Sequence, residues 1–190
     1  NTLGLKPEEF ERIDFEKEFF NDSEQLDHFV KQCDVIVHLA AMNRHSDPEV
    51  IFNNNINLVK ELIASLERTG SKAHVLFSSS SQEEKDNLYG KSKKEGRELL
   101  MNWAEKSGGT FTGMIIPNVF GPFGKPNYNS FIATFCYKLT HGETPSIDND
   151  GEVRLIYVGE LVEEIIKNIR IGETKELYEV PHTSVNKVSE

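Results

Sequence analysis

Short apolar runs alternate along the chain with longer segments in which apolar residues recur every three or four positions. The first pattern predicts buried strands and the second predicts amphipathic helices. Strands are predicted at residues 10–14, followed by 17–20, and then at 34–39, 73–78, 110–116, 153–158 and 176–180. Helices are predicted at residues 23–32, 47–68, 89–106, 130–141 and 160–171. Such alternation is typical of an α/β fold with a doubly wound parallel sheet.

Residues that favour helix ends support several of these boundaries. Ser23 is a suitable N-cap for the first helix, and Asp47-Pro48 places a capping residue before a proline in the first turn of the second. Gly70 and Gly108 follow two predicted helices, where glycine readily adopts the left-handed conformation that ends a helix.

No segment of the chain has the composition of a linker between two complete domains. A loop rich in proline, glycine and asparagine covers residues 117–129. We therefore expect residues 1–116 to form the main α/β part. Residues 117–190 are expected to form a small lobe mixed with the last elements of the sheet.

Composition and charge exclude several classes of function. Lys and Arg number 21 against 31 Asp and Glu, so the net charge is −10, which argues against binding to nucleic acid or to an anionic membrane. Two cysteines do not make a disulfide scaffold, and the six histidines lack the spacing of metal ligands, so we expect no metal. No apolar run is long enough to cross a membrane, and no signal peptide is visible, so we expect a cytoplasmic protein.

Tyr89 and Lys93 form the strongest chemical signal, because residues four apart lie on one face of a helix. A lysine ammonium in this place can lower the pKa of a phenol, which would make the tyrosine a usable acid or base. Chance placement of the two residues on a solvated helix face is the alternative. We interpret Lys91, Lys94 and Arg97 on this helix as a solvated face.

Two predicted strands end in residues that suit a binding crevice. Residues 78–81 are four consecutive serines after an apolar strand, and His38 is followed by Leu39, Ala40 and Ala41. Ligands of open α/β sheets bind at the carboxyl ends of the strands, where a serine hydroxyl can bind a carbonyl and small residues admit a flat cofactor. Serines that merely cap a strand, and tight packing of the alanines, are the alternatives. We expect His38 to pack at the strand end and Cys136 to lie in the core.

In combination these motifs resemble the extended short-chain dehydrogenase/reductase family of nucleotide-sugar epimerases, dehydratases and reductases. The resemblance rests on residues 38–41, Asn55, the serine run, Tyr89 with Lys93, residues 117–122 and residues 154–160. Residues 125–137 and the nine-residue step from Ser80 to Tyr89 more narrowly resemble the capsular-polysaccharide reductases, which act on a UDP-linked 4-keto-6-deoxy-hexosamine. Those proteins usually carry a C-terminal metal-binding cupin domain, and residues 1–190 contain no such domain. Arg154 departs from this subgroup and looks more like the epimerases.

The resemblance implies a Rossmann-like fold and a role for each matching residue. Tyr89 would be the general acid, Lys93 would bind the nicotinamide ribose, and Ser80 would polarise the keto oxygen, with Ser79 and Ser81 as alternatives. Asn55 would support the helix and a proton-relay water near Lys93. Leu39, Ala40, Ala41 and Pro117 would contact the dinucleotide, and Asn118 and Arg154 would bind the UDP-sugar, since a guanidinium suits phosphate oxygens. The family also implies a homodimer.

The resemblance implies that the cofactor is NAD or NADP. Asp14 ends the first predicted strand, and an acidic side chain in that place would bind the adenosine ribose and repel the phosphate of NADP. A solvated aspartate is the alternative.

Three activities remain in view. Dehydratases place an acid pair directly after the catalytic hydroxyl residue, whereas Ser81 and Gln82 follow Ser80, which disfavours water elimination. A reductase is favoured over a 4-epimerase that uses the same serine, tyrosine and lysine. A regulatory protein that binds a dinucleotide without turnover is a further alternative, since a fold alone does not imply an activity.

The family's fold begins with a central strand and a glycine-rich loop that binds pyrophosphate at a helix N-terminus. The sequence opens at Asn1 and contains neither, so we expect it to lack roughly 15–20 residues of that unit. We therefore predict that the 190-residue chain binds NAD and NADP weakly. Calorimetric titration measures this directly, and an affinity ordinary for the family would contradict the prediction.

Overall fold

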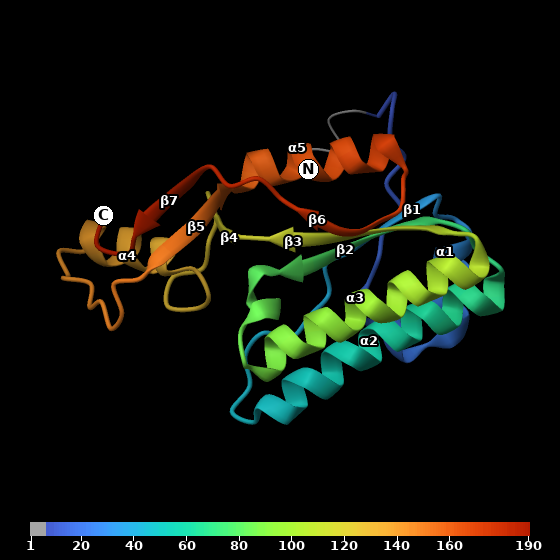
Figure 1. Ribbon diagram of the computed structural model, residues 1–190, viewed down its shortest axis with the longest axis horizontal. Coiled ribbons are helices and arrows are strands. Elements are labelled where there is room, and N and C mark those ends of the chain that lie inside the picture. Colours follow the sequence, from blue (N-terminus) through green and yellow to red (C-terminus); the bar gives the residue numbers. More distant parts are fainter. Residues whose placement is uncertain (1–6) are drawn as a thin grey trace. The chain divides into compact units, whose positions relative to one another are not determined.

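The computed structural model describes residues 7–190 (Figure 1). The chain divides into two compact units. The first runs to residue 115 and includes residues 168–178, and the second comprises residues 116–167 and 179–190. Each unit is described by itself below.

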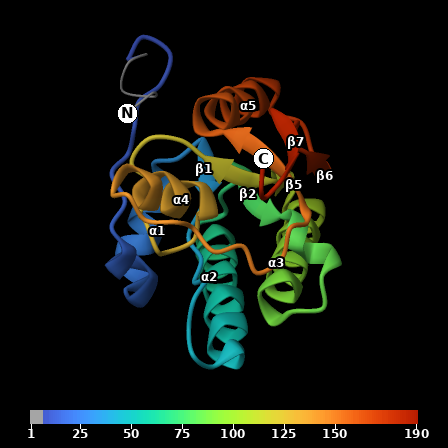
Figure 2. The ribbon, with the colours of Figure 1, turned by 90° about the vertical axis from the view of Figure 1, so that its left-hand side faces the viewer.

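The first unit is an α/β layer structure. Its described elements are the 3-10 helix η2 (Lys17–Asn21), α1 (Ser23–Lys31), β1 (Val35–His38), α2 (Pro48–Thr69), β2 (His74–Ser80), the 3-10 turn η3 (Ser81–Glu84), α3 (Leu88–Ser107), β3 (Thr110–Ile116) and β6 (Lys175–Glu179). The strands form a sheet in the order β1-β2-β3-β6, and β1 and β2 are parallel. Helices α2 and α3 run side by side along one face of this sheet (Figures 1 and 2). This confirms the predicted α/β fold with a parallel sheet.

The core of the first unit lies between that sheet and helices α1, α2 and α3. Its fully buried side chains include Val30 of α1, Leu62 and Leu66 of α2, Phe77 of β2 and Leu100 of α3. Gly96 lets α3 approach closely, because a Cβ there would lie 3.1 Å from the Phe77 ring and 3.2 Å from Val59. The predicted caps of α2 are confirmed, since Asp47 accepts a hydrogen bond from the Glu49 amide and Gly70 adopts a left-handed φ of 65°.

Two of the predicted strands are wrong. Residues 10–16 adopt no regular structure, and residues 17–20 lie in η2. The apolar side chains of this region pack as an aromatic cluster instead, in which the Phe15 ring contacts those of Phe19, Phe20 and Phe29 edge to face. Contact with α1 thus replaces the ladder of hydrogen bonds that a strand would need.

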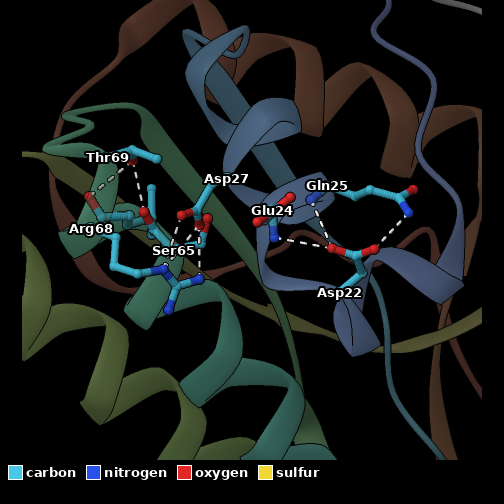
Figure 3. A network of polar contacts seen from close by, with 8 residues as sticks. Asp22, Glu24, Gln25, Asp27, Ser65, Arg68 and Thr69 are labelled. Atoms are coloured by element: carbon cyan, nitrogen blue, oxygen red, sulfur yellow. Dashed lines mark hydrogen bonds and ion pairs between the residues drawn. The ribbon is translucent and has the colours of Figure 1, made fainter.

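The junction of α1 and α2 is polar (Figure 3). Asp22, and not Ser23 as predicted, is the N-cap of α1, because its carboxylate accepts the amides of Glu24 and Gln25 at 3.1 Å each. One turn later, Asp27 accepts a two-pronged hydrogen bond from the Arg68 guanidinium of α2 at 2.8–3.2 Å. These bonds from Arg68 hold the pKa of Asp27 below its usual value.

The second unit contains a smaller sheet in the order β4-β5-β7. Its elements are β4 (Asn118–Phe120), α4 (Phe131–Thr140), β5 (Glu152–Tyr157), α5 (Val158–Ile171), whose last turn belongs to the first unit, and β7 (Ser184–Lys187). Strand β5 pairs in parallel with β4 and antiparallel with β7. Neither β4, which lies in the predicted loop, nor β7 was expected. Cys136 is exposed on α4, so its assignment to the core is wrong.

No helix in the described part of the chain is long and apolar enough to cross a membrane. Within residues 7–190, acidic, histidine and cysteine side chains form no group of three that could hold a metal ion.

Leu66 tests the packing of the first unit. We expect Leu66→Ala to lower the free energy of unfolding by about 2–5 kcal/mol, because the side chain is fully buried and its removal leaves a cavity. Glu67→Ala on the exposed side of the same helix is the matched control and should change stability by less than about 0.5 kcal/mol. Denaturant unfolding of both variants measures the difference, and equal losses would contradict the assigned core.

Candidate active site

The serine run forms the end of β2 and the turn that follows it. Ser78 donates a hydrogen bond to the His38 carbonyl of β1 at 3.1 Å, and Ser79 donates one to the Glu83 carboxylate. The Ser80 hydroxyl accepts the Gln82 amide at 3.2 Å and so caps η3. Ser80 is the last strand residue and is partly exposed, whereas Ser81 already belongs to η3.

Lys93 brings a buried ammonium to this strand end. The side chain is on α3, and its Nζ donates to the Ser78 carbonyl at 2.8 Å. The same Nζ lies 5.0 Å from the centre of the Phe77 ring and 5.8 Å from that of Tyr89. Only 3% of the residue is exposed. Strand β2 and helix α3 therefore bring Lys93 to the Ser78 carbonyl of the serine run and beside the ring of Tyr89.

Burial shifts the pKa values of both residues of the Tyr-x-x-x-Lys pair. It lowers the pKa of Lys93 to about 8, with the Glu83 carboxylate acting in the opposite direction. It raises the pKa of Tyr89, so the expected lowering of this pKa by Lys93 is wrong. The cause is loss of solvation, which favours the neutral phenol. Tyr89 consequently keeps its proton at neutral pH, the form in which a phenol can act as an acid.

Asn55 ties the loop after β1 to the start of α3. Its amide donates to the Met42 carbonyl and to the Ser92 hydroxyl at 3.0 Å each, and its carbonyl oxygen accepts the Met42 amide at 2.6 Å. Ser92 in turn donates to the Tyr89 carbonyl at 2.7 Å. Asn55 thus supports the helix, as expected, although its hydrogen bonds go to Ser92 and Met42 and not to Lys93.

The residues after β1 border a cavity of about 580 Å³. Leu39 is exposed and Ala40 is half-buried, and both line it with residues of β1 and the segment at 9–15. His38 packs at the strand end as predicted, stacked on Phe77 with ring centroids 5.6 Å apart. Burial lowers the pKa of His38 to about 3, so this histidine is neutral and no acid–base partner at ordinary pH. In the described part of the sheet, β1 is an edge strand that pairs only with β2.

Asp14 does not end a strand. Its side chain is 83% exposed and pairs with Arg12 at 2.5 Å in the irregular segment that replaces the predicted strand. The reason given for its contact with the adenosine ribose, a position at a strand end, therefore does not apply.

The remaining predicted site residues are in the second unit. Pro117 is buried, and the exposed Asn118 begins β4. Asn118 pairs with Leu155 of β5, next to the exposed Arg154. A polar amide and a guanidinium thus lie on neighbouring strands of the small sheet.

Glu83 and Arg97 are two residues of this region that the sequence did not predict. Arg97 was assigned to a solvated helix face together with Lys91 and Lys94, but only 5% of it is exposed and it pairs with Glu83 at 2.9 Å. Lys91 and Lys94 are exposed, as expected. The signal was available in the helical period, because Arg97 follows Lys93 by four residues and precedes the buried Leu100 on the same stripe.

Comparison with known families identifies the family to which the chain belongs. The NAD dependent epimerase/dehydratase family matches residues 6–180. The chain belongs to this family. The resemblance inferred from the motifs is thereby confirmed, and the fold agrees with it.

Two relatives and one more distant structure illustrate the likeness. A UDP-2-acetamido-2,6-beta-L-arabino-hexul-4-ose reductase of Pseudomonas aeruginosa is 35% identical over 143 residues, which are 75% of this chain and 38% of that protein. The capsular polysaccharide assembling protein CapF of Staphylococcus aureus is 38% identical, with a TM-score of 0.70, over 87% of this chain and 45% of that one. The UDP-N-acetylglucosamine 4-epimerase of Methanobrevibacter ruminantium has a TM-score of 0.80 at 24% identity, over 92% of this chain and 63% of that one, and shows the shared fold. The chain spans less than half the length of the first two proteins.

Asn55 and its neighbour Asn57 on α2 test the site's buried amide network. We expect Asn55→Ala to lower the free energy of unfolding by about 1–3 kcal/mol, because it removes the partners of the Met42 amide and carbonyl and the donor to the buried Ser92 hydroxyl. Asn57→Ala removes an exposed amide from the same helix and should leave stability unchanged. Thermal unfolding of the pair checks this, and a mild effect of Asn55→Ala would show that the network is dispensable.

Proposed function

We propose that the protein is a nicotinamide-dependent reductase of a nucleotide sugar, acting on the C4 keto group of a UDP-linked 6-deoxy-hexosamine for synthesis of a capsular or other surface polysaccharide. The observation that carries the proposal is the buried Lys93 ammonium, bound to the Ser78 carbonyl and facing the ring of Tyr89. The printed activity of the Pseudomonas relative and the likeness to CapF favour a reductase of this substrate class.

The residues around Tyr89 fit a nicotinamide cofactor. Lys93 uses one of its three ammonium hydrogens on Ser78, which leaves donors for ribose hydroxyls, and the Tyr89 hydroxyl has no hydrogen-bond partner among the described residues. The small residues Ala40 and Ala41 follow β1 and therefore lie at the carboxyl end of this strand, where such cofactors bind. NAD or NADP would be held by Leu39, Ala40, Ala41, Tyr89, Lys93 and Pro117.

The proposed reaction converts a ketone to an alcohol. The reduced nicotinamide, when bound, would supply the hydride that this reduction needs at C4. Tyr89 donates its proton to the carbonyl oxygen, and Ser80 donates a hydrogen bond to the same oxygen and stabilises its developing negative charge. Lys93 holds the ribose and, by its charge, stabilises the tyrosinate that remains after proton transfer. Asn118 and Arg154 are proposed to bind the sugar and its diphosphate.

A 4-epimerase is the second candidate, because the motif around Arg154 resembles that of the epimerases and Arg154 is exposed on β5. An assay with the full-length protein, a UDP-linked 4-keto sugar and either NADH or NADPH separates the two. Loss of nicotinamide absorbance supports the reductase and identifies the preferred cofactor. An isomerised sugar with no net change in cofactor supports the epimerase, and binding without turnover supports a regulatory protein.

Tyr89 is the most direct test of the mechanism. We expect Tyr89→Phe to lower kcat by roughly 100-fold or more, because it removes the general acid and leaves the ring in place. Binding of the dinucleotide should change little. Tyr137→Phe, an exposed tyrosine of α4, is the control for loss of a hydroxyl elsewhere. Steady-state rates of the two variants decide the matter, and a fully active Tyr89→Phe enzyme would overturn the mechanism.

The pH dependence of turnover tests Lys93. The ammonium is present below its pKa of about 8 and is lost above it, so kcat/KM is expected to fall as the pH rises through about 8. Lys93→Met should remove this limb along with most of the activity, whereas Lys91→Met, on the exposed side of the same turn, should keep both. A profile that stays flat between pH 7 and 9 would contradict the role given to Lys93.

A further inference from the structure

Glu83 and Arg97 form a buried ion pair beside the proposed site. Their side chains are only 8% and 6% exposed. Arg97 donates through Nε and Nη2 to both carboxylate oxygens of Glu83, at 2.9–3.2 Å. Neither residue has a part in the chemistry proposed above. Arg97 nevertheless lies one turn after Lys93 on α3, and Glu83 lies three residues after Ser80.

Glu83 also binds the end of strand β2. Its carboxylate accepts a hydrogen bond from the Ser79 hydroxyl. Ser79 lies between Ser78, whose carbonyl binds Lys93, and Ser80, whose hydroxyl is proposed to bind the keto oxygen. A single carboxylate therefore joins the strand that carries the serine to the helix that carries the tyrosine and the lysine.

Arg97 is anchored on its other side by the sheet. It donates through Nη1 to Glu176 of β6 at 3.2 Å, and its side chain crosses β3 at Gly113. A Cβ at Gly113 would lie 2.6 Å from Cδ of Arg97 and 2.4 Å from the Glu176 carbonyl oxygen, so only glycine leaves room for the arginine. Arg97 is thus held by its bond to Glu176 and by its packing over Gly113, in addition to its bonds to Glu83.

The turn that carries Glu83 touches α3 at a second place. A Cβ at Gly90 would lie 2.0 Å from the Gln82 carbonyl oxygen, so η3 rests directly on the helix backbone next to Tyr89. The contact at Gly90 and the pair at Arg97 lie on either side of Lys93 along α3. Together they fix the distance and the rotation between the strand end and the helix.

Stability alone is a poor reason for such a pair, because desolvation of two charges offsets most of their attraction and well-packed apolar residues often serve as well. Fixed geometry is what a bidentate arginine–carboxylate pair provides beyond an apolar contact. We propose that Glu83 and Arg97 are positioning residues, which hold Ser80 in register with Tyr89 and Lys93 for proton transfer. This inference rests on the proposed reductase function.

The first test separates positioning from folding. Glu83→Gln should lower kcat of the full-length enzyme at least about tenfold with KM for the sugar changed less than about twofold, because the reacting groups lose alignment while the binding residues remain. Glu84→Gln, an exposed carboxylate in the same turn, is the matched control and should keep the wild-type kcat.

The double variant Glu83→Gln/Arg97→Met keeps the test decisive if Glu83→Gln folds poorly. Removal of both charges leaves no unpaired buried ion, so its stability should return to near that of the wild type. Its kcat should stay low. Recovery of kcat together with stability would overturn the proposal and show that the pair is only structural.

A measurement without turnover distinguishes failure of this proposal from failure of the proposed function. Three titratable groups act on or lie beside Lys93: His38 of β1, which is neutral, Tyr89 of α3, and Glu83 of η3, whose carboxylate raises the Lys93 pKa. NMR titration of the Lys93 side chain should give a pKa lower in Glu83→Gln than in the wild type, and unchanged in Glu84→Gln. An unchanged value in Glu83→Gln would overturn the positioning role, whereas an active Tyr89→Phe enzyme would overturn the function alone.

Discussion

The hydrogen bond from Lys93 to the Ser78 carbonyl is the interaction on which the candidate site depends. A lysine ammonium is costly to bury, and the cost is visible here because burial lowers the pKa of Lys93 to about 8. The buried ammonium lies where the second turn of α3 packs against the end of β2. The bond also occupies the Ser78 carbonyl near the end of the strand, so the sheet, the helix and the cation are fixed by the same contact.

Polar groups surround this contact in an ordered way. Asn55 holds the loop after β1 to α3 through Ser92, and Glu83 holds the end of β2 to α3 through Arg97. The first network joins elements that are distant in sequence, the second joins β2 to the helix that follows it, and both are satisfied by hydrogen bonds. A buried polar network of this kind fixes one arrangement of the elements more sharply than apolar packing does. The first unit consequently has an apolar core, and the polar networks of Asn55 and of Glu83 with Arg97 fix the positions of β2 and α3 next to it.

Local signals explain which features could be predicted from the sequence. Tyr89 and Lys93 were found because helical spacing places them on one face, and the ends of α2 were found because Asp47 and Gly70 cap it. The fold class followed from the alternation of elements. Failures share a non-local cause. Strand β7 exists through its pairing with β5, and the burial of Arg97 depends on a carboxylate 14 residues away. The predicted strand at residues 10–14 is absent because the apolar residues of this region pack on α1, and the local sequence pattern does not indicate this contact.

The contact of Gly90 with the Gln82 carbonyl has a consequence for how this sequence can change over time. Any larger residue at position 90 would drive the turn away from the helix. Such a change would not be confined to folding, because the same displacement would part the serine of the strand from the tyrosine of the helix. We therefore expect no substitution of Gly90 to be neutral. The adjacent exposed Lys91 is free to vary, so tolerance to substitution changes abruptly between two neighbouring residues.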